Sequence, residues 1–205
     1  MDEAGARKRA VRPRDAAGLV VVREGRGGAE VLMGLRAAGH RFMPNRLAFP
    51  GGRVERRDYA ASASADLSAA TRAMLEKSAR PLLAHALGIA AARELAEETG
   101  LSLGERPALG KLFYLCRAIT PSRLPMRFHA RFLVVAAEAL EGTLGGSGEL
   151  EALRFYRLDE TKPEALPWIT AQVLAELATW LRLPAPARAS VRETAVYRDR
   201  VRKVE

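Results

Sequence analysis

The sequence lacks the features that mark several classes of protein. It has a single cysteine, Cys116, among 205 residues, so it forms no internal disulfide and offers no cysteine framework for a metal. No apolar run reaches the roughly eighteen residues of a membrane span, so no spanning helix is expected. The first residues also lack the apolar segment of a secretory signal. We therefore expect a cytoplasmic enzyme of one domain with additions.

Excess positive charge is concentrated at the two ends of the chain. The formal net charge is +9, of which residues 1–15 contribute +2 and residues 184–205 contribute +3. Neither end interleaves aromatic residues that could stack on bases, so we do not expect nucleic-acid binding and favour phosphorylated small molecules as ligands. We predict a flexible basic arm over residues 1–16 and a basic C-terminal tail over residues 184–205.

Apolar periodicity predicts a sequence of strands, a central helix, more strands and a late helix. This order indicates an α+β fold with α/β/α layers. The predicted strands cover 17–23, 30–35, 47–49, 109–117, 126–137 and 153–158, with a short strand at 195–197. The predicted helices cover 66–78, 82–99 and 169–183. Asp66 is the expected N-cap of the first helix, and Pro81 is expected to open the second.

Three acids and one arginine lie at the end of the central helix, in the segment Arg93–Leu101. Helical spacing puts Glu94, Glu97 and Glu98 on one face, where their charges repel one another. Arg93 can pair with Glu97 and offsets one charge, and Mg²⁺ or Mn²⁺ could offset the others. The alternative is a solvated helix face with local ion pairs. Gly100 is expected to end the helix.

Two separated segments together resemble the signature of Nudix hydrolases. Gly52 is followed by five residues and then Asp58, and Arg93–Leu101 reads Arg-Glu-Leu-Ala-Glu-Glu-Thr-Gly-Leu. The second segment matches the Nudix box at every defined position. There are two departures: Asp58 stands where the family usually has Glu, and 34 residues separate the segments where the family has seven. The resemblance implies a Nudix fold with a mixed central sheet over residues 17–183, with an insertion at about 59–80 that carries an extra helix.

The resemblance also implies an enzyme that hydrolyses a diphosphate bond with Mg²⁺ or Mn²⁺. Its metal ligands would be Glu94, Glu97, Glu98 and the Gly51 carbonyl. Arg93 would orient a glutamate through an ion pair. Asp58 would either take part in the site or bond local backbone amides in a turn.

The base that activates water differs among Nudix enzymes. Glu94 is one candidate here. Glu149 or Glu151 is another, because both lie by a glycine-rich loop that could bring a carboxylate to the metals. The alternative for both loop acids is simple exposure to solvent.

The segment before the box resembles that of coenzyme A diphosphatases of the peroxisomal type. It keeps both arginines, Arg36 and Arg41, at the spacing of that group, but has Gly34 for Thr and Asn45 for Gly. Asn tolerates left-handed backbone geometry, so the second change is mild. The chain ends in Arg-Lys-Val-Glu, which is not a peroxisomal address. The predicted substrate-binding residues are Arg36, Arg41, Gly52 and Asp58, although either arginine could also be an ordinary surface residue.

Coenzyme A or acyl-coenzyme A is the first expected substrate. ADP-ribose, NADH or a dinucleotide polyphosphate is the alternative. A module that binds a nucleotide or RNA without turnover is an alternative of another class, although the intact acids argue against it. The apolar stripe of the inserted helix must be buried against something. It packs on its own domain, on a second subunit of a homodimer, or at the rim of the substrate pocket, and we favour the homodimer.

Overall fold

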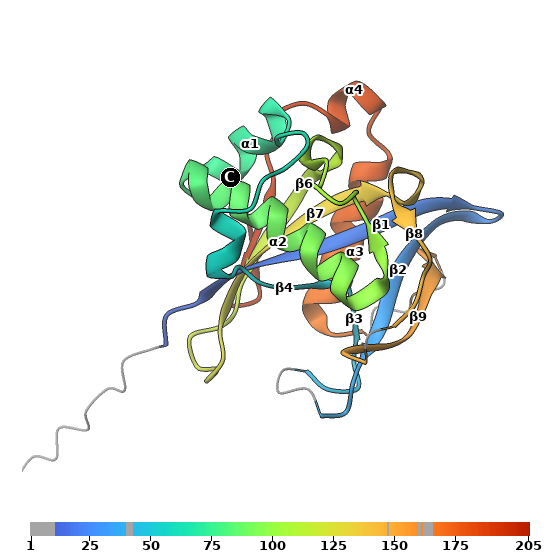
Figure 1. The fold of residues 1–205 in the computed structure, drawn as a ribbon. Coiled ribbons are helices and arrows are strands. Elements are labelled where there is room, and N and C mark those ends of the chain that lie inside the picture. The colour runs from blue at the N-terminus through green and yellow to red at the C-terminus, as the bar shows by residue number, and fades with distance from the viewer. Residues whose placement is uncertain (1–10, 40–42, 147, 160, 162–165) are drawn as a thin grey trace, which may run out of the picture.

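A mixed nine-stranded sheet runs through the centre of the computed structural model, which describes residues 11–39, 43–146, 148–159, 161 and 166–205 (Figure 1). Its main strand order is β11-β10-β6-β7-β1-β2-β3, with β4 paired to β1 and β9 paired to β2. The strands are β1 (Arg14–Gly25), β2 (Gly28–Arg36), β3 (Leu47–Ala48), β4 (Gly51–Arg53), β6 (Phe113–Ile119), β7 (Phe128–Ala136), β9 (Leu150–Arg157), β10 (Ala195–Arg198) and β11 (Val201–Val204). β5 (Leu101–Ser102) and β8 (Glu141–Gly142) form a separate two-stranded ladder.

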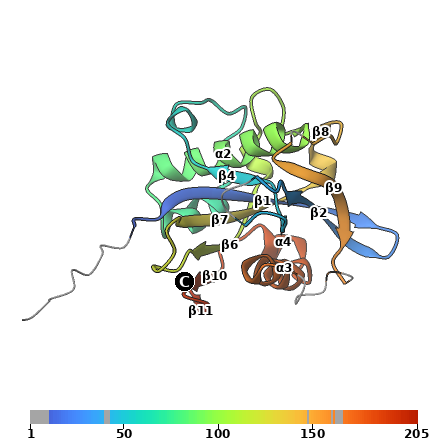
Figure 2. The ribbon, with the colours of Figure 1, turned by 90° about the horizontal axis from the view of Figure 1, so that it is seen from below.

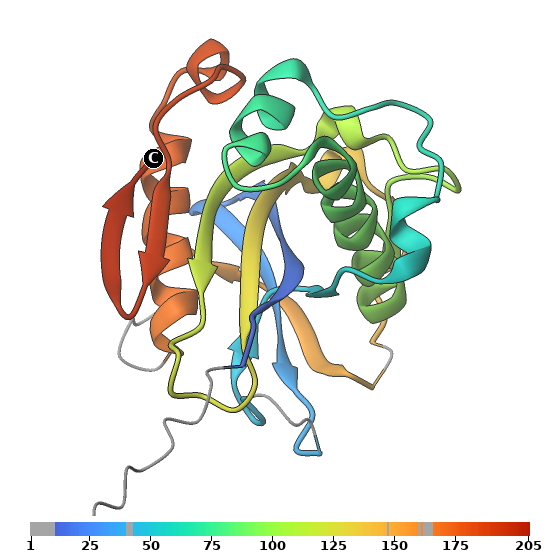
Figure 3. The ribbon, with the colours of Figure 1, turned by 90° about the vertical axis from the view of Figure 1, so that its left-hand side faces the viewer.

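Helices cover both faces of the sheet, which confirms the expected α/β/α layers. α1 (Ala69–Glu76) and α2 (Pro81–Thr99) lie on one face, and α3 (Trp168–Leu181) and α4 (Ala185–Arg188) on the other (Figures 2 and 3). Short 3-10 turns occur at Arg56–Tyr59, Leu109–Lys111 and Ala137–Ala139.

Strand β1 has an apolar cluster on each of its faces. Leu19 and Val21 pack in the cluster that contains Leu87 and Leu95 of α2. Val20 and Val22 pack in the cluster with Val173, Leu174 and Leu177 of α3. Successive side chains of a strand point to opposite faces, so a strand buried on both sides carries a continuous apolar run. Residues 19–22 are such a run.

The central helix has the ends that the sequence predicts. Pro81 occupies its first turn, and Gly100 caps its C-terminus in the left-handed conformation at φ 74°. The first helix is shorter than predicted. It begins after Ser68, whose hydroxyl accepts a hydrogen bond from the Thr71 amide, so Ser68 and not Asp66 is the N-cap.

The inserted segment packs on its own domain. Met74 and Leu75 of α1 are buried in the same cluster as α2, and the Thr71 hydroxyl donates to the Leu112 carbonyl at 2.8 Å. The apolar stripe is therefore covered within the chain. The prediction that a second subunit covers this stripe was therefore wrong, while the homodimer itself stays a prediction.

Both predicted tails are partly built into the sheet. β1 begins at Arg14, so residues 14–16 belong to the domain, while residues 1–10 lie outside the described part of the chain. β10 pairs in parallel with β6, and β11 pairs with β10. The domain thus extends beyond residue 183 to include a C-terminal hairpin. Within the described residues, no helix is both long enough and apolar enough to cross a membrane.

Candidate active site

A cleft of about 1120 Å³ opens between the end of α2, strand β4, the strand ends of β6 and β7 and the start of α3. Five glutamates line it: Glu55, Glu94, Glu97, Glu98 and Glu149. In the described residues, the insertion at 59–80 contributes nothing to the lining. The third alternative for the inserted helix, that it borders the substrate pocket, is therefore wrong.

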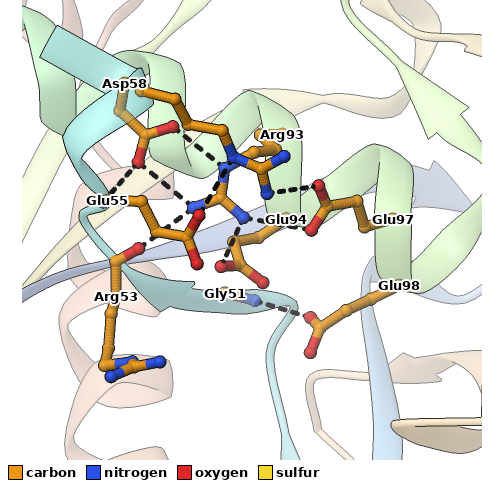
Figure 4. A network of polar contacts seen from close by, with 9 residues as sticks. Gly51, Arg53, Glu55, Asp58, Arg93, Glu94, Glu97 and Glu98 are labelled. Atoms are coloured by element: carbon orange, nitrogen blue, oxygen red, sulfur yellow. Dashed lines mark hydrogen bonds and ion pairs between the residues drawn. The ribbon is translucent and has the colours of Figure 1, made fainter.

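Two adjacent glycines of β4 lie directly beneath two of these carboxylates. The Gly51 amide donates to Glu98 Oε2 at 2.8 Å (Figure 4). Gly51 has φ 151°, and a Cβ there would lie 2.4 Å from the Ala17 carbonyl oxygen. A Cβ on Gly52 would lie 2.1 Å from Glu94 Oε1. The glycine pair is therefore required by the close approach of β1 on one side and of Glu94 on the other.

Arg93 joins the acidic face of α2 to the segment around β4. Its Nη1 donates to Glu94 Oε1 at 2.8 Å and to Glu97 Oε2 at 3.0 Å, and its Nη2 donates to the Arg53 carbonyl at 3.0 Å (Figure 4). Its Nε donates to Asp58 Oδ1 at 2.9 Å. Burial alone would lower the pKa of Arg93, but the hydrogen bond with Asp58 and the charge of Glu94 raise it above its usual value. Arg93 is thus a fixed cation that orients Glu94.

Asp58 has a different place from the one predicted. Only 1% of the residue is exposed, and it is not part of the cleft lining. Its carboxylate accepts from the Glu55 amide at 2.7 Å as well as from Arg93. The prediction of Asp58 as a substrate-binding residue was wrong. It is both a turn aspartate and the anchor of Arg93.

Burial raises the pKa of both carboxylates above the glycine pair. Burial raises the pKa of Glu98 to about 7, with the charges of Glu94 and Glu149 adding to the effect and the Gly51 amide and Arg36 opposing it. Burial also raises the pKa of Glu94, against the lowering effect of Arg93, and Glu97 and Glu149 raise it further. At both carboxylates the effect of burial on the pKa outweighs that of the nearby arginines, Arg93 and Arg36.

These acids have the chemistry to hold a divalent cation, since Mg²⁺ and Mn²⁺ prefer carboxylate oxygens. Among the residues that the structure describes, however, no three acid, histidine or cysteine side chains are grouped closely enough to hold a metal. Arg93 draws Glu94 and Glu97 to itself, and Glu97 is half exposed and also paired with Arg57. Glu94 and Glu98, which both stand over the glycine pair, are the best-placed pair of metal ligands. A third carboxylate would have to turn toward them to complete a metal site.

The structure separates the two loop acids that the sequence could not distinguish. Glu149 lines the cleft, and its charge acts on Glu94, Glu98 and Arg36. Glu151 is absent from that lining and pairs with Leu35 in the β2–β9 ladder. The ladder shifts register beside this point, and Ala152 has φ 49°, which marks a bulge.

Arg36 lies in the cleft on the same side as the acids. Burial lowers its pKa, while the charges of Glu98, Glu149 and Glu94 act in the opposite direction. The other predicted arginine, Arg41, lies outside the described residues.

Comparison with known proteins identifies the domain. Residues 86–177 match the NUDIX domain family. The chain carries a Nudix domain. No curated protein matches the sequence.

Comparison with solved structures extends the likeness beyond the residues that match the family. A NUDIX hydrolase from Alicyclobacillus acidocaldarius is similar with a TM-score of 0.62 and 26% identity, over 80% of this chain and 90% of that one. A MutT NUDIX hydrolase from Burkholderia pseudomallei has a TM-score of 0.53 and 20% identity over 82% and 99% of the two chains. The NUDIX domain of Shewanella oneidensis NrtR, complexed with ADP ribose, has a TM-score of 0.53 and 15% identity over 83% and 90%. The Nudix fold and the prediction of a hydrolase are supported.

The family match begins inside α2, after the insertion, although the glycine pair of the Nudix site lies before it. In the structure, β4 pairs with β1 under the end of α2, which brings the glycine pair next to the carboxylates of the matched region. The cleft also includes residues that no motif indicated, among them Trp168 at the start of α3 and Tyr197 of β10. Only the parallel pairing of β10 with β6, which the sequence does not reveal, brings Tyr197 there.

Proposed function

We propose that this chain is a metal-dependent hydrolase of a diphosphate bond in a nucleoside diphosphate derivative, with coenzyme A or acyl-coenzyme A as the first candidate. One observation carries the proposal: two carboxylates, the buried Glu98 and the partly buried Glu94, stand over a glycine pair at the wall of a cleft that also holds Arg36. Acids whose pKa values are raised by burial suit a site in which a bound cation stabilises their ionised form and links them to a phosphorylated ligand.

The chain's own residues have distinct parts in this reaction. Glu94 and Glu98 would hold the cation, and Arg93 fixes the position of Glu94. Mg²⁺ or Mn²⁺, when bound, stabilises negative charge on the phosphoryl oxygens. Arg36 places a guanidinium beside the diphosphate, where it can pair with phosphate oxygens.

Glu149 is the favoured base that takes a proton from the attacking water. It lies in the cleft, and in the described residues no ion pair holds it. Glu94, the other candidate, is already paired with Arg93 at 2.8 Å. A carboxylate that is not committed to an arginine is the better proton acceptor.

The segment before the box supports coenzyme A as the first candidate. Asn45 has φ 54°, a left-handed geometry that both Asn and Gly tolerate, so the replacement of the motif's glycine by Asn is mild. Gly34 is explained by packing, because a Cβ there would lie 2.9 Å from Leu153 Cδ2 and 3.0 Å from Leu150 Cβ. The loss of the motif's threonine is therefore a consequence of how β9 packs on β2, and it does not by itself argue for another substrate.

ADP-ribose is the strongest alternative substrate, because the Nudix domain complexed with ADP ribose shares the fold. The test is a panel of coenzyme A, acetyl-coenzyme A, ADP-ribose, NADH and diadenosine tetraphosphate, each with Mg²⁺, with Mn²⁺ and with EDTA. Only with metal should phosphorus NMR show the diphosphate signal of coenzyme A, acetyl-coenzyme A, ADP-ribose or NADH replaced by two monoester signals, or diadenosine tetraphosphate converted into ATP and AMP or into two ADP. Binding without cleavage of any member would support the non-catalytic module.

A further inference from the structure

The cleft has a second region, away from the carboxylates, that the reaction does not use. We call it the distal end and define it by Arg14, Leu124, Phe128, Trp168, Arg123 and Arg200, all of which line the cleft. Strand register places all of them except Trp168 at one end of the sheet, and the Trp168 ring at the start of α3 lies 5.6 Å from that of Tyr197 in β10. Arg14 pairs with Phe128, Ile119 with His129, and Arg198 with Ile119, so the start of β1, the β6–β7 loop and the β10–β11 turn are neighbours (Figure 3).

The distal end is positively charged and has no acid of its own. The acids that line the cleft come from the β4–α2 region and from the segment before β9, and they are Glu55, Glu94, Glu97, Glu98 and Glu149. Two further acids adjoin these arginines in the chain: Asp15 pairs with Arg131, and Asp199, whose side chain is 57% exposed, lies 3.9 Å from Arg198. Across the described residues, none of the three distal arginines forms an ion pair with an acid. The cleft is therefore polarised, with acids at one end and only cations at the other.

Arg200 occupies a backbone position that suits glycine far better than arginine. It is the second residue of the two-residue turn between β10 and β11, with φ 64°, after Asp199 with φ 52°. Such a turn needs positive φ at both positions and favours Asn-Gly or Asp-Gly. An arginine there costs stability relative to glycine, and strain of this kind is characteristic of functional positions.

We propose that the distal end binds a phosphate monoester that the substrate carries in addition to its scissile diphosphate. The class of substrate is a nucleotide phosphorylated on its ribose. The apolar side chains Leu124, Phe128 and Trp168 lie beside the three arginines and offer a surface for the base or another apolar part of the substrate. This inference rests on the proposed diphosphatase function and extends it to substrate choice.

The experiment compares substrates that differ by one phosphate: NADPH with NADH, and coenzyme A with its 3′-dephospho form. The distal variant is Arg123→Ala with Arg200→Gly. Arg26→Ala with Arg182→Ala, two exposed arginines outside the cleft lining, removes the same charge as a control. In the wild type, kcat/KM should favour the phosphorylated member of at least one pair by about tenfold, the order expected from one charge-assisted contact.

The distal variant should lose this preference, leave kcat/KM for the dephosphorylated member within about twofold, and unfold at the same or a higher temperature because glycine relieves the turn. The control variant should keep the preference. An unchanged preference in the distal variant, or an equal loss in the control, overturns the inference.

A binding measurement keeps the inference separate from the proposed reaction. Calorimetry with metal-free protein should show tighter binding of adenosine 3′,5′-bisphosphate or adenosine 2′,5′-bisphosphate than of AMP, and the distal variant should abolish the difference. If no substrate is cleaved but this difference is present, the proposed reaction fails and the distal site stands. If cleavage occurs and wild-type protein binds both bisphosphates no better than AMP, the distal site fails alone.

Discussion

Gly52 and Glu94 show how little space the site leaves at the level of single residues. The two are 42 positions apart in sequence, yet the missing Cβ of Gly52 would stand 2.1 Å from a carboxylate oxygen of Glu94. Gly52 does not have a positive φ, so glycine is needed there only because a Cβ would collide with Glu94. The sequence motif records this glycine, but only the pairing of β4 beneath α2 explains it.

Gly52→Ala should displace Glu94 and lower kcat by about a hundredfold or more, because a misplaced ligand costs transition-state stabilisation. The fold should survive, since the backbone conformation suits alanine. Steady-state kinetics with Mg²⁺ and a thermal melt check both statements. Gly145→Ala is the control, because a Cβ there meets nothing within 4 Å. Equal activity in the two variants would contradict the close contact.

Glu149 and Glu151 form a natural matched pair for assigning the base. Glu149→Gln should lower kcat by about 10²- to 10⁴-fold, the usual range for removing a general base, with little change in substrate affinity. Glu151→Gln should leave kcat within about twofold, because Glu151 does not line the cleft. Single-turnover kinetics across pH separates the effect on chemistry from product release. The reverse pattern would move the base to Glu151.

Sequence periodicity could place Glu94, Glu97 and Glu98 on one helix face because a helix repeats regularly. It could not separate Glu149 from Glu151, because both were placed by a loop, where no regular period fixes the direction of a side chain. The bulge at Ala152 and the register shift opposite Gly34 interrupt the regular ladder here. A bulge depends on packing between two strands that are distant in sequence, so local pattern does not report it.

The element that holds the site together is the segment of β4 and the following 3-10 turn, clamped to α2 through Arg93. Asp58 sits at the centre of this clamp, and its carboxylate serves both the turn and the arginine. This clamp explains how the fold accommodates the long insertion. Gly51 and Gly52 contact Glu98 and Glu94 of α2 although residues 59–80 lie between them in the sequence.

Asp58→Asn should destabilise the fold by about 3 kcal/mol, because removing one partner of a buried ion pair leaves the other charge uncompensated. It should also lower kcat, since Arg93 no longer holds Glu94 firmly. Asp66→Asn is the control, as Asp66 is 72% exposed and 3.5 Å from Arg72, and should change stability by less than about 1 kcal/mol. Urea denaturation measures both. A difference below experimental error would remove Asp58 from the clamp.

The sequence predicted correctly those elements whose ends or apolar runs are marked by neighbouring residues. The ends of α2 follow from Pro81 and Gly100, and β1 from its apolar run. The segment 109–117 was predicted as one strand, but it begins with a 3-10 turn at Leu109–Lys111 before β6 starts at Phe113. Leu109 and Leu112 are buried in the core either way, so burial alone did not distinguish the two forms. The short strand predicted at 195–197 is β10. Its partner β11 and its parallel pairing to β6 were missed, because that pairing is non-local.

At the scale of the whole molecule, the buried Glu98 links stability to pH. Its pKa is raised from 4.5 to about 7, so between these values the folded protein holds a proton that the unfolded chain releases. Stability of the metal-free protein should therefore fall as pH rises through this window, by up to about 3 kcal/mol.

Urea denaturation in EDTA at pH 5 and pH 8 tests this slope, and Glu98→Gln should flatten it. Added Mg²⁺ should stabilise the wild type more at pH 8 than at pH 6, because the metal requires the ionised carboxylate. A wild-type stability that rises between pH 5 and pH 8 in EDTA, relative to Glu98→Gln, would contradict the assigned burial of Glu98.

The central claim is that Glu98 belongs to a metal site that cleaves a diphosphate bond. Phosphorus NMR of coenzyme A or ADP-ribose with Mg²⁺, using wild type and Glu98→Gln, tests it most directly. We predict that the wild type converts the diphosphate into two monoesters, and that a folded Glu98→Gln protein is slower by about a thousandfold or more. Cleavage by Glu98→Gln at the wild-type rate would contradict the account.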